Sequence, residues 1–267
     1  MVNDRPRVNI HLGARDIFPT LVRKSAAALA EQMRQSSSVF ISPEMFKADV
    51  QWQLSSIAGA PDFEVPTSSY LSLPSISNEH RTIAISQHAT LIDTKGPSTS
   101  GILYFRQPDF LLGLEDYFDG ANIHVHLIVT CQHDYGPLVD TRQTVSTHVS
   151  WSKLATNIMA CIPSAHLTVW AIEKPETCAV SFVTTVLGLD PHSLSEAERS
   201  LIIRDAAQQR FAQPKKPIPD ALEDISIQLD SLYDFDIQKL PTIPRVMVMN
   251  ADGNQLRPKP ATAQDDT

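Results

Sequence analysis

The stretch ANIHVHLIVTC, residues 121–131, has the clearest strand pattern in the chain. Apolar side chains on one side of the alternation are Ile123, Val125, Leu127, Val129 and Cys131, and the other side carries His124, His126, Ile128 and Thr130. A period of two is typical of a strand with one apolar face. The stretch therefore predicts a strand whose second face is mixed.

Short β-rich segments lie on both sides of this strand. They cover residues 39–41, 48–54, 81–93, 101–106, 143–151, 166–173 and 178–187. Lys174-Pro175-Glu176-Thr177 between the last two reads as a hairpin turn, and the serine- and proline-rich residues 55–79 read as a long loop. The spacing is irregular and shows no strand–helix–strand alternation. We therefore predict a mainly β protein, an antiparallel β-sandwich or jelly roll with flanking helices at both ends.

Helix signals lie mostly toward the two ends of the chain. Apolar residues recur every three or four positions from Pro19 to Gln35, which is typical of an amphipathic helix. Further helices are predicted over 108–119, from a cap at Ser152 to Cys161, from the capping box at Ser195–Glu198 to Phe211, and over the acidic residues 220–232.

These signals divide the chain into three segments. Residues 1–38 form an N-terminal arm and amphipathic helix, residues 39–190 the predicted β-sandwich core, and residues 191–267 C-terminal helices with an acidic extended tail. We expect residues 1–15 to be irregular. We expect most of residues 240–267 to be extended or disordered, because they are rich in Pro, Asn and Asp.

Charge and composition narrow the classes of partner. The chain has 267 residues, with 30 Asp and Glu against 22 Lys and Arg and a net charge of −8. Such an acidic chain is a poor general binder of phosphate backbones. It has no run of about 18 apolar residues to span a membrane and no apolar segment near the start typical of a secretory signal. Three widely spaced cysteines favour a reducing compartment over a disulfide framework.

The common catalytic and cofactor motifs are absent from the sequence. There is no GxGxxG, no GxxxxGK[ST] and no GxSxG, and the chain has only nine glycines. Cys131 and Cys161 lie in apolar surroundings typical of small buried side chains rather than reactive thiolates. We predict no catalytic residue, no cofactor and no metal site.

His124 and His126 provide the one possible metal pair. Two histidines two positions apart on a strand point to the same face, where they can share a metal. This His-x-His pair is similar to that of the cupin family, also a jelly roll, but the following LIVTCQHD lacks the glutamate of that pattern. The resemblance implies a metal-dependent jelly-roll enzyme as an alternative function. The simpler interpretation, which we adopt, places both imidazoles on a half-exposed sheet face.

The strand rhythm of residues 39–187 resembles that of a viral single jelly-roll coat protein. The resemblance runs from GILYFR (101–106) through residues 121–131 to TVWAIE (168–173) and CAVSFVTTVL (178–187). It implies a subunit of the virion, found also in host cytoplasm, that contacts copies of itself or other capsid subunits. A strongly cationic arm is missing, so the resemblance implies few genome contacts and no membrane contact.

A second resemblance is to plant-virus movement proteins, which carry a Leu-x-Asp signature at the end of a strand. Leu91-Ile92-Asp93 and Leu138-Val139-Asp140 both match it. This resemblance implies RNA binding, which the net charge of −8 disfavours. We therefore predict a structural assembly protein, not an enzyme, that acts through subunit contacts, and keep the movement-type RNA-binding protein as an alternative.

Overall fold

The computed structural model describes residues 5–13, 17–46, 76–77, 79–88, 92–93, 104–105, 111, 113–130, 150–172, 175–211, 223–250 and 252–256. The strand predicted over 48–54, most of the loop predicted over 55–79 and most of the strand predicted over 143–151 lie outside these residues.

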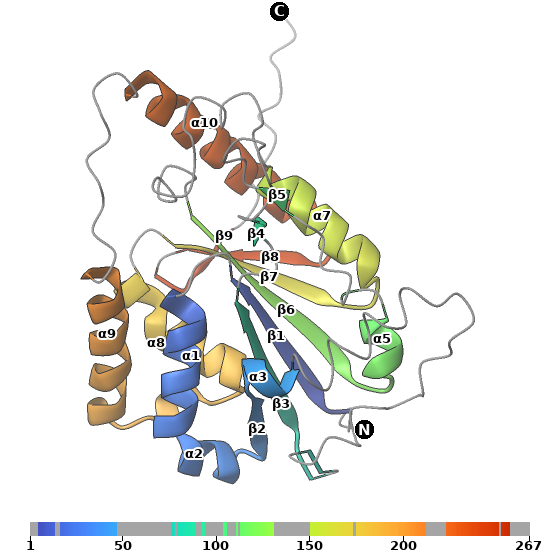
Figure 1. The fold of residues 1–267 in the computed structure, drawn as a ribbon, viewed down its shortest axis with the longest axis vertical. Helices are drawn as coiled ribbons and strands as arrows, with labels where there is room; N and C mark the ends of the chain where they lie inside the picture. Colours follow the sequence, from blue (N-terminus) through green and yellow to red (C-terminus); the bar gives the residue numbers. More distant parts are fainter. Residues whose placement is uncertain are drawn as a thin grey trace, which may run out of the picture.

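One seven-stranded sheet runs through the molecule (Figure 1). In spatial order its strands are β2 (Ser38–Ile41), β3 (Thr82–His88), β1 (Arg7–Gly13), β6 (Asn122–Val129), β7 (His166–Ala171), β8 (Val246–Met249) and β9 (Gln255–Leu256). Every neighbouring pair is parallel except β8 with β9. A separate antiparallel pair joins β4 (Ile92–Asp93) to β5 (Tyr104–Phe105). The predicted antiparallel β-sandwich or jelly roll is therefore wrong, and the fold is a mostly parallel α/β sheet.

Strand β1, which lies in the interior of the sheet, comes from the predicted irregular arm. It pairs with β3 on one side and with β6 on the other. Val8, Ile10 and Leu12 are fully buried on one face of the sheet. The sheet thus takes strands from each of the three segments into which the sequence was divided, because β1 lies before residue 38 and β8 and β9 lie after residue 191.

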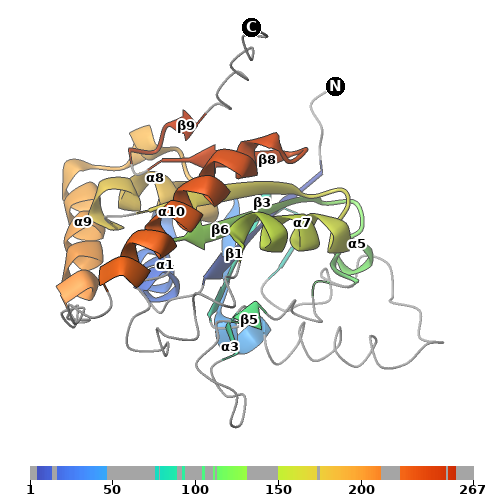
Figure 2. The ribbon, with the colours of Figure 1, turned by 90° about the horizontal axis from the view of Figure 1, so that it is seen from above.

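Helices cover both faces of the sheet (Figures 1 and 2). One face carries α1 (Ile17–Ala28) and α8 (Pro175–Leu187), with α9 (Glu196–Phe211) packed against both helices. The other face carries α7 (Trp151–Cys161), α10 (Glu223–Lys239) and the short α3 (Pro43–Met45) and α5 (Leu114–Tyr117). The helices at the two ends of the chain are layers of the core rather than flanking additions.

Two of the predicted helices are confirmed by their side-chain contacts. The amphipathic helix forms as α1 and α2 (Ala30–Gln35), with a break at Leu29, and its apolar residues lie in the core between α1, α8 and the sheet. The capping box also forms, since the backbone N–H and the Oγ of Ser195 both donate to Glu198 Oε2 at 2.7 Å.

The segment 178–187, predicted as a strand after a hairpin turn, is helical and belongs to α8. Pro175 begins this helix, a position where its missing N–H costs nothing. The apolar and β-branched residues are buried around most of the helix because α8 contacts the sheet on one side and α1 and α9 on others. Burial on several sides removes the 3.6-residue periodicity by which a helix is recognised.

The C-terminal region is also more ordered than predicted. The acidic helix predicted over 220–232 forms as α10 and continues to Lys239, and the 3₁₀ turn Leu240–Thr242 follows it. The chain then adds β8 beside β7 in parallel, and β9 pairs back on β8. Val248 is fully buried in the core formed by α7 and the sheet.

A buried carboxylate joins α10 to the start of α7. Asp236 is 1% exposed, and its oxygens accept hydrogen bonds from Ser150 Oγ at 2.7 Å, Trp151 N at 2.7 Å and Ser152 Oγ at 2.8 Å. Ser150, rather than the predicted Ser152, is the N-cap of α7 and accepts from Lys153 N. Asp236 therefore completes the hydrogen bonds of this helix end from 84 residues away in sequence.

Gly188 ends α8 and lies against β3, so its replacement tests how closely helix and sheet approach. Its φ is +69°, and a Cβ there would lie 2.5 Å from Thr82 Cγ2, whereas Gly120 at φ +80° has no atom within 4 Å of the same position. We expect Gly188→Ala to lower the free energy of unfolding by about 2–4 kcal/mol, and Gly120→Ala by about 1 kcal/mol from backbone strain alone. Denaturant unfolding of both variants measures this difference, and equal losses would contradict the close approach.

Candidate functional site

The helices that follow the neighbouring strands β1 and β6 lie on opposite faces of the sheet. The first helix after β1 is α1, and the next described helix after β6 is α7, on the other face (Figure 1). In doubly wound α/β sheets, ligands bind outside the carboxyl ends of strands whose connections diverge in this way. The carboxyl ends of β1 and β6 are the switch point of this sheet and its first candidate site.

The amino end of α1 lies at the switch point. Only three residues separate Gly13, the last residue of β1, from Ile17, the first of α1. The amides of the first helical turn have no partner within the helix, and they mark the positive end of its dipole. Pro19 removes one of these donors, and Thr20 N–H is used by the first bond within the helix, which leaves the amides of Ile17 and Phe18. An anionic group is the ligand chemistry that such a helix end favours.

Thr130 follows β6 at the same edge of the sheet. It is 7% exposed, and its Oγ1 has no hydrogen-bond partner within the described part of the chain. A buried hydroxyl without a partner costs about 1–3 kcal/mol. The Thr130 hydroxyl is therefore a group that a bound polar ligand would stabilise.

A buried histidine and serine lie on the same sheet face as α1. His11 Nδ1 and Ser86 Oγ are 2.8 Å apart, and both residues are fully buried. The His11 ring also packs edge-on against Phe182 of α8, with ring centroids 5.0 Å apart. A Ser–His pair in a cleft would suggest nucleophilic catalysis, but this one is enclosed between the sheet and α8. Its role is to satisfy polar groups inside the core.

Asn9 is the centre of a second buried polar cluster. Its Nδ2 donates to the carbonyl oxygens of Thr185 and Val186, both at 2.9 Å, and its Oδ1 accepts from Arg7 Nε at 2.8 Å. The first two bonds satisfy carbonyls of the last turn of α8. The sequence interpretation missed both Asn9 and His11, although VNIHLG at residues 8–13 alternates as a strand does.

His126 belongs to this cluster and is not available as a metal ligand. It is fully buried, with Trp170 Nε1 donating to its Nδ1 and its Nε2 beside Asn9 Oδ1, each at 3.4 Å. Burial holds the pKa of His126 well below its usual value, and the positive charge of Arg7 lowers it further. His126 is therefore a neutral core residue.

His124 shares a sheet face with His126, as the alternation predicts, but it stacks on His166. The two rings, on neighbouring strands, have centroids 5.1 Å apart and an angle of 26° between their planes. Burial, then Arg7, then His166 lower the pKa of His124 to about 4. The His-x-His pair is thus divided between two environments. Within the described ranges, no group of three or more His, Cys, Asp or Glu side chains is arranged to hold a metal.

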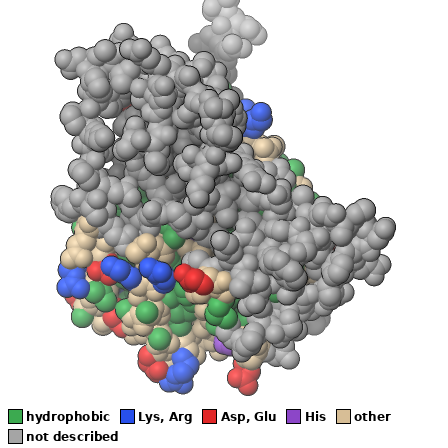
Figure 3. Space-filling model, viewed as in Figure 1, with side chains coloured by type: hydrophobic (Ala, Val, Ile, Leu, Met, Phe, Trp, Pro, Cys, Tyr) green, Lys and Arg blue, Asp and Glu red, His purple; other side chains and the backbone are tan. Residues whose placement is uncertain are grey.

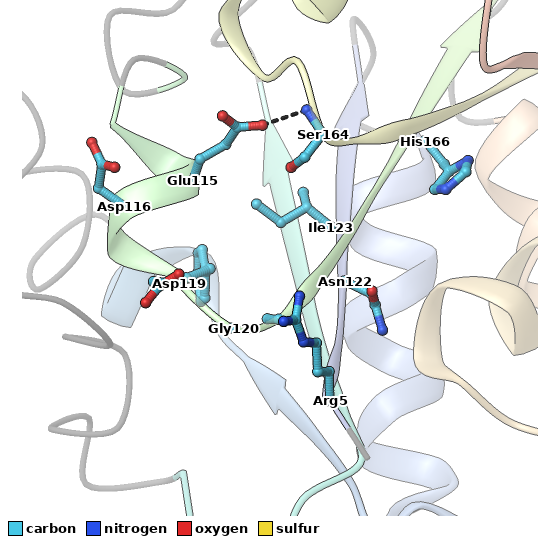
Figure 4. A pocket seen from close by; sticks show the side chains of 11 residues that line it. Arg5, Glu115, Asp116, Asp119, Gly120, Asn122, Ile123, Ser164 and His166 are labelled. Atoms are coloured by element: carbon cyan, nitrogen blue, oxygen red, sulfur yellow. Dashed lines mark hydrogen bonds between the residues drawn. The ribbon is translucent and has the colours of Figure 1, made fainter. Parts of the chain in front are cut away.

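A cavity of about 340 Å³ lies at the opposite, amino edge of the sheet (Figure 4). Arg5, Asn122 and His166 line it together with acidic residues around α5, namely Glu115, Asp116 and Asp119. Glu115 Oε1 accepts from Ser164 N at 2.5 Å, which fixes α5 against the start of β7. The cavity is polar, and its carboxyl groups outnumber the single guanidinium of Arg5, so it disfavours an anionic ligand.

The described cysteines are not reactive thiolates. Cys178 is fully buried, and burial raises the pKa of its thiol to about 12. Burial also raises the pKa of Cys161. Both thiols are therefore protonated near neutral pH. The sequence predicted a small buried side chain at Cys161, which is half-buried in the structure. Cys131 lies outside the described residues.

Comparison with known proteins supplies no relative: no protein-family model, no curated protein and no solved structure matches this chain. Within the described ranges, none of the helices combines the length and the hydropathy of a bilayer-crossing segment.

The neutral state of His124 makes stability depend on pH. With a pKa of about 4 when folded and about 6.5 when unfolded, His124 takes up its proton more readily in the unfolded chain. The free energy of unfolding should therefore fall as the pH is lowered from about 6.5 to about 4. We expect His124→Gln to make this dependence shallower without abolishing it, because the pKa of His126 is also held well below its usual value. The same change at the exposed His192 is the control. Urea unfolding at a series of pH values measures the free energy of unfolding of both variants. Parallel curves of this free energy against pH would contradict the contribution assigned to His124.

Proposed function

We propose that this chain binds a small ligand with an anionic group at the switch point, between the carboxyl ends of β1 and β6. The observation that carries the proposal is the divergence of α1 and α7 from these two neighbouring strands. Open α/β sheets bind their ligands at such points, because the diverging connections leave room there. The amino end of α1 supports a negative charge, and the buried hydroxyl of Thr130 supports a hydrogen-bonding ligand.

The sequence limits the size of this anion. GxGxxG and GxxxxGK[ST] are absent, so the turn after β1 is not one of the glycine-rich loops that surround several phosphates. The amides of Ile17 and Phe18 suit one carboxylate, phosphate or sulfate group better than a di- or triphosphate. Catalysis is not part of the proposal, and the absence of enzymatic activity stays a prediction.

A carboxylate added to the first turn of α1 tests the proposal. Thr20→Asp favours the helix through its dipole but repels an anion at its end, by roughly 1 kcal/mol at a separation of about 6 Å near the surface. We expect about fivefold weaker binding of inorganic phosphate. Ala27→Asp adds the same charge at an exposed position near the other end of α1, where we expect less than a twofold effect.

The measurement is a phosphate titration followed by the backbone amide NMR signals. Signals of Phe18, Thr20 and Thr130 should move along saturable curves. Absence of saturable shifts at these three residues, or equal affinities of the two variants, would exclude the switch point as the binding site.

A second candidate function is assembly through subunit contacts. The predicted capsid function depended on a jelly-roll fold, which the structure contradicts. Only the more general prediction, that copies of the chain contact one another, is kept as a candidate. The observation that favours it is Phe235 of α10, which is 62% exposed although its neighbour Asp236 is buried. A large exposed aromatic side chain on a docked helix is typical of the residues that anchor interfaces.

Light scattering after size exclusion tests the assembly function. We expect the protein to be larger than a monomer at micromolar concentration and Phe235→Ser to shift it toward the monomer. Ile203→Ser on α9 is the control, since Ile203 is also exposed, at 43%, but lies on another helix. A strict monomer at several pH values would remove the assembly function.

RNA binding, the movement-type alternative, stays a prediction. On the face in Figure 3, described Lys and Arg side chains lie beside acidic ones rather than forming a field of one sign. Arg23 faces Glu44 at 3.9 Å, and Arg34 pairs with Glu31 at 2.5 Å. The described side chains on this face therefore form no platform for a phosphate backbone.

A further inference from the structure

We propose that Arg7, His124 and His166 form a second binding site, for a single phosphate or sulfate group, on the amino-terminal half of the sheet face that α8 covers. Arg7 comes from β1, and the two histidines come from the next two strands, β6 and β7. The site lies at the opposite end of the strands from the switch point, and it does not depend on the function proposed there.

Side chains on this face become less buried toward the amino ends of the strands, so this half of the face is accessible to solvent. Farther along the same face, His11 and His126 are fully buried beneath α8. Toward the amino ends, Arg7 and His124 are half-buried and His166 is exposed. Solvent and small ions therefore reach Arg7, His124 and His166 but not His11 and His126.

Arg7 is a cation held in place without a counter-ion among the described residues. Its Nε is fixed by Asn9 Oδ1, and Asn9 is itself held by two carbonyls of α8. The ion pairs found in the described ranges involve Arg23, Arg34 and Arg204 but not Arg7. A half-buried guanidinium has lost part of its hydration, so an oxyanion that binds its terminal N–H groups in the bidentate manner restores favourable interactions.

The two histidines add N–H donors next to this charge. Asn9 lies opposite His124 in the sheet, and His124 lies opposite His166, so the guanidinium and both imidazoles share one patch. A neutral imidazole carries one N–H, which can donate to an oxyanion. A metal cation is a poorer ligand for the same patch, because Arg7 repels it.

The other charged groups near this patch restrict the ligand to a single compact anion. His126, behind His124, is neutral and buried. Arg5 lies at the same edge, but the cavity that His166 lines also carries the carboxylates of Glu115, Asp116 and Asp119. These carboxylates repel a long polyanion that extends past His166. One tetrahedral oxyanion, free or at the end of a larger molecule, fits this distribution of charge.

Anion binding and the protonation of His124 are linked. A bound sulfate would offset the positive charge of Arg7, which is one of the causes that hold the pKa of His124 at about 4. Bound sulfate should therefore raise this pKa, and the affinity for sulfate should increase as the pH falls.

The experiment is a sulfate titration of the full chain at constant ionic strength, at pH 5.5 and pH 7.5, followed by the imidazole NMR signals. Sulfate keeps the same charge over this range. We expect saturable shifts of His124 and His166 with little change at His11 and His126, and affinity about threefold or more higher at pH 5.5. Absence of saturable shifts, or equal shifts in all four rings, would overturn the site.

Two variants and a matched control complete the test. Arg7→Gln should weaken sulfate binding about tenfold or more, whereas Lys24→Gln removes the same charge from an exposed position on α1 and should leave it within twofold. His166→Gln changes an exposed side chain, keeps the fold, and should weaken binding about threefold. Equal affinities of Arg7→Gln and Lys24→Gln, or an unaltered affinity of His166→Gln, would overturn the proposal. Shifts of the amide signals of Phe18, Thr20 and Thr130 during the phosphate titration test only the site at the switch point. The two proposals can therefore fail independently.

Discussion

Parallel pairing of β1 on both of its edges is the constraint on which the rest of the structure depends. Its apolar face, Val8, Ile10 and Leu12, is fully buried against the core of α7 and the sheet. Its polar face is buried as well, and Asn9 there must find partners for its amide. It finds them in the carbonyls that end α8, which fixes the position of that helix on the sheet. The helix layer on this face is therefore positioned by a hydrogen-bonded side chain as well as by apolar contact.

Elements with strong local signals could be predicted from the sequence. The strand at residues 122–129, the amphipathic helix over 17–35 and the capping box at Ser195 are all determined by nearby residues. The arrangement of the strands could not be predicted, because the partners that decide it are remote: His11 meets Ser86 across 75 residues, and Asn9 meets Val186 across 177. Alternation also misled the interpretation. A polar face on a strand usually lies toward solvent in an antiparallel sheet. The polar face of β1, in contrast, is buried beneath α8.

The candidate site shows the same division between local and remote information. The spacing of His124 and His126 correctly places both rings on one face, yet it cannot show that Trp170 and Asn9 enclose one of them and that His166 stacks on the other. The residues that mark the switch point, Gly13, Thr130 and the first turn of α1, have no distinctive motif in the sequence. Their significance comes from the order of the strands, which is a property of the whole chain.

The contact of Asp236 with the start of α7 has a consequence for the order in which a ribosome delivers this chain. Residues 150–152 leave the exit tunnel before residue 236, so until residue 236 follows, the first turn of α7 lacks the hydrogen bonds that Asp236 accepts. Likewise β1 emerges first but must wait for β3 and β6 to supply its edges. The contact between α7 and α10 therefore forms late, after Asp236 of α10 has been released.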